Sequence, residues 1–144
     1  MKNIYLISLL FSIIAVSGCS HVVELSKTLW GSSTRALEKA RENADEKTFE
    51  CSIDECFDAA LSLAKEDEAQ DSKSKKVFDL FLVNRQKQHI VVMGVPGSVN
   101  TTEVGVFFVD AGAKATRVEV SSLSSNARQR VSEIIFKELE EQFK

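Results

Sequence analysis

The stretch TEVGVFFVDAGAKATRVEVS, residues 102–121, decides the fold expected for this chain. Hydrophobic and polar residues alternate along its second half, as they do in strands that bury one side. In the second half, Val118 and Val120 are expected to point inward, and Arg117 and Glu119 outward. A short glycine-containing connection joins the halves and favours an antiparallel hairpin.

The first half of this hairpin, residues 102–110, is apolar on both of its sides. One side carries Val104, Val106 and Phe108. The other carries Glu103, Gly105, Phe107 and Val109, with Phe81 and Val83 of an earlier strand as further candidates for the same face. That face is more apolar than one that meets water. Three explanations fit this apolar face: the N-terminal helix covers it, the sheet curves around it, or it meets a partner.

Two more strands are predicted upstream, at residues 77–84 and 89–95. In the first, Phe78, Leu80 and Leu82 are expected to share one face. The second is rich in β-branched residues and opens at His89, which is expected to be a surface or edge histidine rather than a catalytic base. Short connections between successive strands favour antiparallel pairing.

Two helices flank these strands. Ser52 and Glu55 form a capping box for the first, whose expected apolar face consists of Ile53, Cys56, Phe57, Ala60, Leu61 and Ala64. Ser125 or Asn126 is expected to cap the second, which runs to about Phe143. Its expected buried stripe consists of Ala127, Val131, Ile134, Ile135 and Leu139.

These elements predict an α+β fold, a two-layer sandwich with both helices on one face of a mainly antiparallel sheet. The sheet has four strands, or five if residues 47–51 add one. Before it, an amphipathic helix with an Ala-rich stripe is expected from Ser32 or Ser33 to about Ala44.

An apolar leader opens the chain and ends in Val16-Ser17-Gly18-Cys19. The apolar run that follows Lys2 is too short to span a membrane, which needs about 20 residues, and is typical of a secretory signal. This box resembles the lipobox of bacterial lipoproteins, and the resemblance covers residues 1–20. It implies that the leader is cut before Cys19, and that the cysteine sulfur and new amine are acylated. An ordinary secretory signal and an uncleaved anchor are the alternatives.

The resemblance also sets the expected organisation and location. It divides the chain into a signal peptide (1–18), a lipidated tether with the amphipathic helix (19–46) and the α+β domain (47–144). Several acyl chains would anchor the protein stably in a membrane. In such lipoproteins Ser20 after the cysteine implies the outer membrane, with the domain facing the periplasm.

The other two cysteines are expected to form a disulfide. With Cys19 lipidated, Cys51 and Cys56 are the remaining thiols, and an exported chain meets an oxidising compartment. They flank the predicted helix start at the two positions that touch in a hydrophobic staple. A redox-active pair is the alternative, although the Cys-x-x-Cys spacing is missing. Two sulfurs and two distant histidines do not match a zinc site, and we expect no metal or cofactor.

Composition narrows the function classes further. The leader carries one charged residue, Lys2, so the formal charge of −3 becomes −4 for residues 19–144. A mildly acidic chain without a basic run is a poor candidate for nucleic acid. No nucleophile elbow or carboxylate pair is evident, and His89 and Cys56 are the residues that an enzyme would have to use.

We therefore expect a non-catalytic envelope lipoprotein whose domain binds or supports other envelope components. Its architecture is similar to that of small helix-and-sheet domains of outer-membrane assembly lipoproteins, without a shared motif. The candidate contact residues are Pro96, Gly97, Ser98, Asn100 and Thr101 of the longest glycine-bearing loop, together with Phe107. The alternative is a module that binds a small ligand or glycan between sheet and helices.

Overall fold

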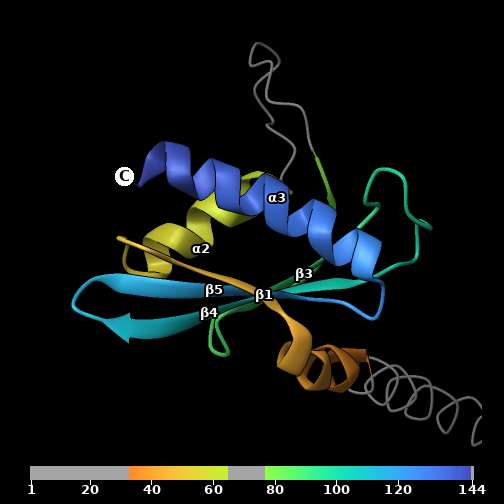
Figure 1. The fold of residues 1–144 in the computed structure, drawn as a ribbon, viewed down its shortest axis with the longest axis horizontal. Coiled ribbons are helices and arrows are strands. Elements are labelled where there is room, and N and C mark those ends of the chain that lie inside the picture. The colour runs from red at the N-terminus through yellow and green to blue at the C-terminus, as the bar shows by residue number, and fades with distance from the viewer. Residues whose placement is uncertain (1–32, 65–76, 144) are drawn as a thin grey trace, which may run out of the picture. The chain divides into compact units, whose positions relative to one another are not determined.

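The computed structural model describes residues 33–64 and 77–143 (Figure 1). The predicted leader, the lipobox and Cys19 lie outside these residues, so they stay predictions. Ala36–Lys144 forms one compact unit, separate from Met1–Arg35.

The structure confirms the α+β class and the antiparallel sheet. Helical residues 33–39 lead into the following elements: η1 (Ala40–Asn43), β1 (Asp45–Phe49), α2 (Ile53–Ser62), β2 (Asp79–Asn84), β3 (His89–Met93), β4 (Val104–Gly112), β5 (Ala115–Ser121) and α3 (Ser125–Gln142). The strands follow the order β1-β5-β4-β3-β2, and each neighbouring pair is antiparallel. Figure 1 shows α2 and α3 on the same side of this sheet.

The β4–β5 hairpin is tight and twisted. Ala113 and Lys114 both have positive φ, at 36° and 65°. Two successive left-handed residues form the turn that matches the right-handed twist of the flanking strands. Gly112, at φ 88°, follows a bulge and donates its N–H to Asp110 Oδ1 over 2.8 Å. Glycine adopts this φ without the steric cost that a side chain adds.

The fifth strand exists, but it begins earlier than predicted. β1 pairs with β5 from Asp45↔Val120 to Phe49↔Thr116 and ends before Cys51. The strand stops there because Cys51 belongs to the disulfide and Ser52 caps the next helix, so the chain has to turn. β1 therefore forms one edge of the sheet and β2 the other.

The prediction that Phe78, Leu80 and Leu82 share a face is wrong. A bulge between Leu80 and Leu82 shifts the register against β3, and an extra residue in a strand reverses the side-chain alternation beyond it. Phe78 is buried in the core beneath the helices, whereas Leu82 packs with Phe81 on the opposite face. Leu80 is 36% exposed at the edge.

The main core lies between the sheet and the two helices. The stripe of α3 is confirmed, since Ala127, Val131, Ile135 and Leu139 are fully buried and Ile134 is partly buried. The cap differs from the prediction, because the Ser124 hydroxyl accepts the N–H of Ala127 over 3.3 Å. Ser124 is the last extended residue before the helix, the geometry that a capping residue needs.

A second, smaller cluster lies on the opposite face of the sheet. Leu37 packs there with Val91 and Phe107, against the partly buried Phe81 and Leu82. We call residues 36–43 the cover segment. Of the three explanations for this apolar face, covering by the N-terminal helical region is the one observed.

Candidate functional site

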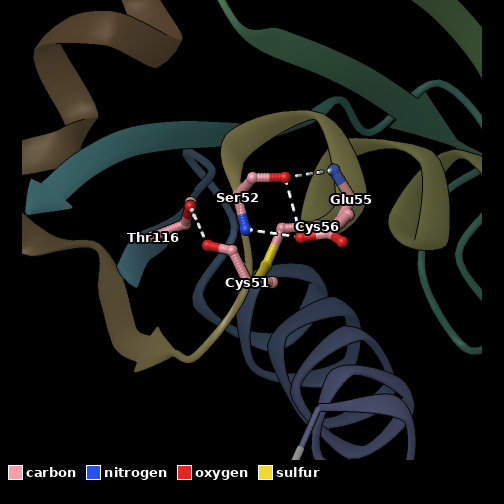
Figure 2. Close-up of a disulfide and its surroundings, with 5 residues drawn as sticks. All are labelled: Cys51, Ser52, Glu55, Cys56 and Thr116. Carbon is pink, nitrogen blue, oxygen red and sulfur yellow. Dashed lines mark hydrogen bonds between the residues drawn. A yellow bond between two sulfur atoms is a disulfide. The ribbon is translucent and has the colours of Figure 1, made fainter. Parts of the chain in front are cut away.

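The structure confirms the Cys51–Cys56 disulfide (Figure 2). The two Cα atoms are 5.8 Å apart, and the residues are 2% and 0% exposed. Ser52 Oγ accepts the Glu55 N–H over 3.3 Å, and Ser52 N–H donates to Glu55 Oε2 over 2.8 Å. The hydrogen bonds that the Ser52 N–H and the Ser52 hydroxyl donate to the Glu55 carboxylate lower the pKa of Glu55 below its usual value. The capping box thus places Cys51 just before the cap and Cys56 at the fourth position of α2, the two positions that touch in a hydrophobic staple, as predicted.

The disulfide also joins the start of α2 to the sheet. Thr116 of β5 donates its hydroxyl to the Cys51 carbonyl over 2.9 Å (Figure 2). Both sulfurs belong to the main core. Redox-active cysteines are partly exposed and lie in electropositive surroundings, whereas these are enclosed by apolar side chains. The geometry favours a bond that fixes how the chain enters α2.

A row of side chains crosses the face of the sheet that is opposite α2 and α3. Strand pairing aligns Asn84, His89, Phe107, Glu119 and Glu46, one from each strand. Residues that face each other across antiparallel strands share a face, so these side chains are neighbours. Sequence reasoning did not find this row, because it depends on the register of four strand pairs.

Two contacts seat Leu37 on this row. Ser121 donates its hydroxyl to the Leu37 carbonyl over 2.8 Å. A Cβ at Gly105 would lie 2.7 Å from the Phe107 ring and 3.4 Å from Leu37 Cβ. The missing side chain at Gly105 therefore leaves the room that Phe107 and Leu37 occupy.

An ion pair between the cover segment and β5 also holds the cover segment on this row. Arg41 Nε donates to Glu119 Oε2 over 2.7 Å, and its guanidinium carbon lies 4.6 Å from the centre of the Phe107 ring. Arg117 Nε donates to Glu119 Oε1 over 2.9 Å. Burial by itself would raise the pKa of Glu119, but Arg41 and then Arg117 outweigh it and lower that pKa. Glu119 was expected to face water, whereas the cover segment buries it.

His89 is not the surface histidine that the sequence predicts. It is 1% exposed on a strand flanked by β2 and β4, and its ring centre lies 5.3 Å from that of Phe107. The ring hydrogen-bonds to the Lys87 backbone, whereas Nε2 has no partner among the described residues. Burial lowers the pKa of His89 below 6.5 and outweighs the opposite influence of that hydrogen bond.

The loop that carries the predicted contact residues is ordered by its own backbone. Gly94 N–H donates to the Asn100 carbonyl over 3.3 Å, and Ser98 N–H to that of Val95 over 3.0 Å. The residues Pro96, Gly97, Asn100 and Thr101 are exposed, and Ser98 is partly so. Phe107 is buried and pairs with His89, at the end of β3 away from this loop. The structure does not bring Phe107 and the loop together.

A polar groove lies between the cover segment and the start of α3. Its lining includes Lys39 and Asn43 on one side, and Ser122, Leu123, Ser125 and Arg128 on the other. Arg128 Nε lies 3.2 Å from Asp45 Oδ1 of β1, so this arginine forms an ion pair with the edge strand. The space between sheet and helices, where a ligand was considered, holds the buried side chains of the main core.

Four large apolar side chains are exposed in the described part of the chain. Leu80 and Val83 lie on β2 and are 36% and 38% exposed. Val99 is 72% exposed in the loop, and Leu123 is 81% exposed before α3. Two of the four therefore lie on one edge strand of the sheet.

Within residues 33–64 and 77–143, no three His, Cys, Asp or Glu side chains are grouped so as to hold a metal ion. The same residues contain no helix that is long and apolar enough to cross a membrane. The sequence matches no protein-family model and no curated protein.

Proposed function

We propose that this chain is a lipoprotein of a bacterial envelope, anchored in the outer membrane through Cys19. Its domain, on this proposal, binds or supports other envelope components in the periplasm without catalysing a reaction. The observation that carries the proposal is the pairing of the lipobox-like Val16-Ser17-Gly18-Cys19 with the Cys51–Cys56 disulfide. Disulfides persist in exported proteins and are rare in the cytosol.

Burial of the two enzyme candidates supports a non-catalytic domain. Cys56 is 0% and His89 1% exposed, and a general base or nucleophile has to reach its substrate. Glu119 is held by two arginines rather than turned to an open site.

The β2 edge is the surface that we propose for partner contact. β2 is the last strand in the order of the described sheet, and an edge strand can add an extended segment of another chain. The β1 edge carries Asp45, Glu46 and Lys47, and charge opposes such pairing. β2 instead exposes Leu80 and Val83. An extended, apolar segment of an envelope protein fits it.

Membrane attachment is tested first, by fractionating cells that express the full chain or its Cys19→Ala variant. The wild-type chain should sediment with outer membranes and carry the mass of its acyl groups, and the variant should lose both. A wild-type chain without added lipid mass would refute the anchor. Reduction should raise the mass by about 2 Da, the two hydrogens of one cleaved disulfide.

Partner binding is tested by a photocrosslinking residue at Val83, with the same residue at Thr48 on the β1 edge as control. Val83 should give a discrete crosslinked envelope protein, and Leu80→Lys should reduce that product strongly, because an edge lysine opposes strand addition. Equal products from both edges, or none from Val83, would contradict the β2 proposal.

A small-ligand or glycan module is the second candidate, and the groove beside the cover segment favours it. Serine hydroxyls, Asn43 and Lys39 supply donors and acceptors there. A thermal-shift screen of soluble glycans should then raise the melting temperature of the wild-type chain, and Lys39→Ala should weaken that rise. A screen in which no glycan raises the melting temperature would refute the ligand proposal, and partner binding would be the proposal that remains.

A further inference from the structure

His89 combines deep burial with an unsatisfied nitrogen. Its side chain is enclosed, and Nε2 lacks a partner among the described residues. Most buried polar atoms have a hydrogen-bond partner, and one without it costs free energy. A neutral imidazole leaves only a lone pair unsatisfied here. A protonated one would bury a second N–H and a full charge, which costs far more.

The charged groups around His89 do not offset that cost. On the cover segment Glu38 favours the charged imidazole, whereas Arg41 opposes it, as does Lys87 in the turn before β3. Across the sheet its neighbours are the neutral Asn84 of β2 and Phe107 of β4. Beyond Phe107, the charge of Glu119 is already engaged by arginines, Arg41 among them.

We propose that protonation of His89 releases the cover segment from the sheet, so that the fold contains an acid-triggered switch. Lifting the segment would let water reach Nε2 and would remove Arg41 from its vicinity. The segment is held by a small cluster, the Arg41–Glu119 ion pair and the Ser121–Leu37 hydrogen bond. Release would expose Val91 and Phe107 as an apolar surface. The inference goes beyond the proposed function and does not depend on it.

The direction of the pH effect follows from linkage. With the segment in place, the pKa of His89 is lowered by burial, whereas in the open form it would return toward 6.5. The open form therefore binds the proton more tightly, and opening increases as the pH falls below about 6.5. The gain is at most about tenfold per pH unit for one proton, and it ends below the pKa of the closed form.

Hydrogen exchange tests the switch in the full chain held in detergent micelles. Exchange of the 36–43 amides, corrected for intrinsic rates, should rise about tenfold between pH 7.5 and 5.5, from the linkage of one proton. The amides of α3 serve as the internal reference and should change little. Equal acceleration in α3 would indicate global unfolding and overturn the proposal, as would unchanged protection of residues 36–43.

The chain offers a matched control, because it contains two histidines. His21→Gln should keep the response, and His89→Phe should abolish it while the apolar ring keeps the site packed. His21→Gln also leaves one imidazole, so an NMR titration reads His89 directly in an unaltered core, even if His89→Phe fails to fold. A pKa of 6.5 or higher in that titration would overturn the proposal.

Discussion

The two faces of the sheet are covered in different ways. On one face, α2 and α3 bury a continuous core of aliphatic and aromatic side chains. On the other, the cover segment places Leu37 and Arg41 over a row that mixes Phe107 with His89 and Glu119. The first face is held by apolar burial, and the second combines a few apolar contacts with an ion pair and a hydrogen bond.

This difference between the two faces indicates which part of the fold opens most easily. Apolar area removed from water contributes roughly 25 cal/mol per Å², so the larger helix-side core dominates global stability. Regions with few buried apolar contacts open at lower free energy than the core. We therefore expect the cover segment to exchange before the helices do, and substitutions on the two faces to differ in size.

The largest expected effect is on the helix face. Phe57 of α2 is buried with its ring 5.1 Å from that of Phe108. Phe57→Ala should reduce the free energy of unfolding by about 3–5 kcal/mol, measured by urea denaturation. The exposed Val99→Ala should change it by less than about 0.5 kcal/mol. A smaller loss for Phe57→Ala than for changes on the opposite face would break the comparison.

The second largest effect is expected at Gly105, on the face of the sheet that the cover segment covers. Gly105→Ala would place its Cβ 2.7 Å from the Phe107 ring, and overpacking of this kind costs about 1–3 kcal/mol. Urea denaturation of the full chain measures it. The double variant Gly105→Ala/Phe107→Leu makes room for the new methyl group and should recover part of the loss. If Gly105→Ala does not reduce the free energy of unfolding, the tight packing of Phe107 and Leu37 at Gly105 would be refuted.

The ion pair between the cover segment and β5 should matter less. A double-mutant cycle with Arg41→Gln and Glu119→Gln should give a coupling free energy of about 1 kcal/mol, within the range for contacting residues. Arg117 still engages Glu119 when Arg41 is replaced, which limits the effect. Thermal or urea unfolding of the four proteins measures the coupling. Zero coupling would mean that Leu37 alone holds the segment.

The smallest effect is expected for an exposed pair near the helix face. Asp58 and Arg85 form an ion pair with side chains that are 59% and 52% exposed. Solvent screens such pairs, so Asp58→Asn should cost less than about 0.5 kcal/mol by urea denaturation. Arg85 also lies over the Phe57 ring, 4.8 Å from its centre, and is left unchanged for that reason. A loss above 1 kcal/mol would show that charge contributes to this face.

The sequence predicted the elements whose signals are local. The alternation at Val118 and Val120, the capping box at Ser52 and Glu55 and the α3 stripe depend on neighbouring residues, and the structure confirms each. The disulfide was predictable as well, because both cysteines flank one helix start. Phe78 and Leu82 were misplaced because a bulge leaves no plain mark in the residue pattern.

The candidate site was mostly beyond such reasoning. His89 was expected at the surface because its position at the start of a strand says nothing about what lies above it. Burial follows instead from strand order, which places β3 between β2 and β4, and from the path of residues 36–43. The apolar residues Phe107 and Val109, with Phe81 and Val83 as further candidates, were the signal that something covers this face.

By itself, the sequence determined the α+β class, the helix-side core and the disulfide, because periodicity, capping and cysteine spacing act over a few residues. Only the tertiary structure decided that Arg41 pairs with Glu119, 78 positions away, and that His89 is buried beside Phe107. Those contacts depend on the register of several strand pairs and on where the cover segment lies. The residues next to a position in the sequence reveal neither the strand register nor the path of the cover segment.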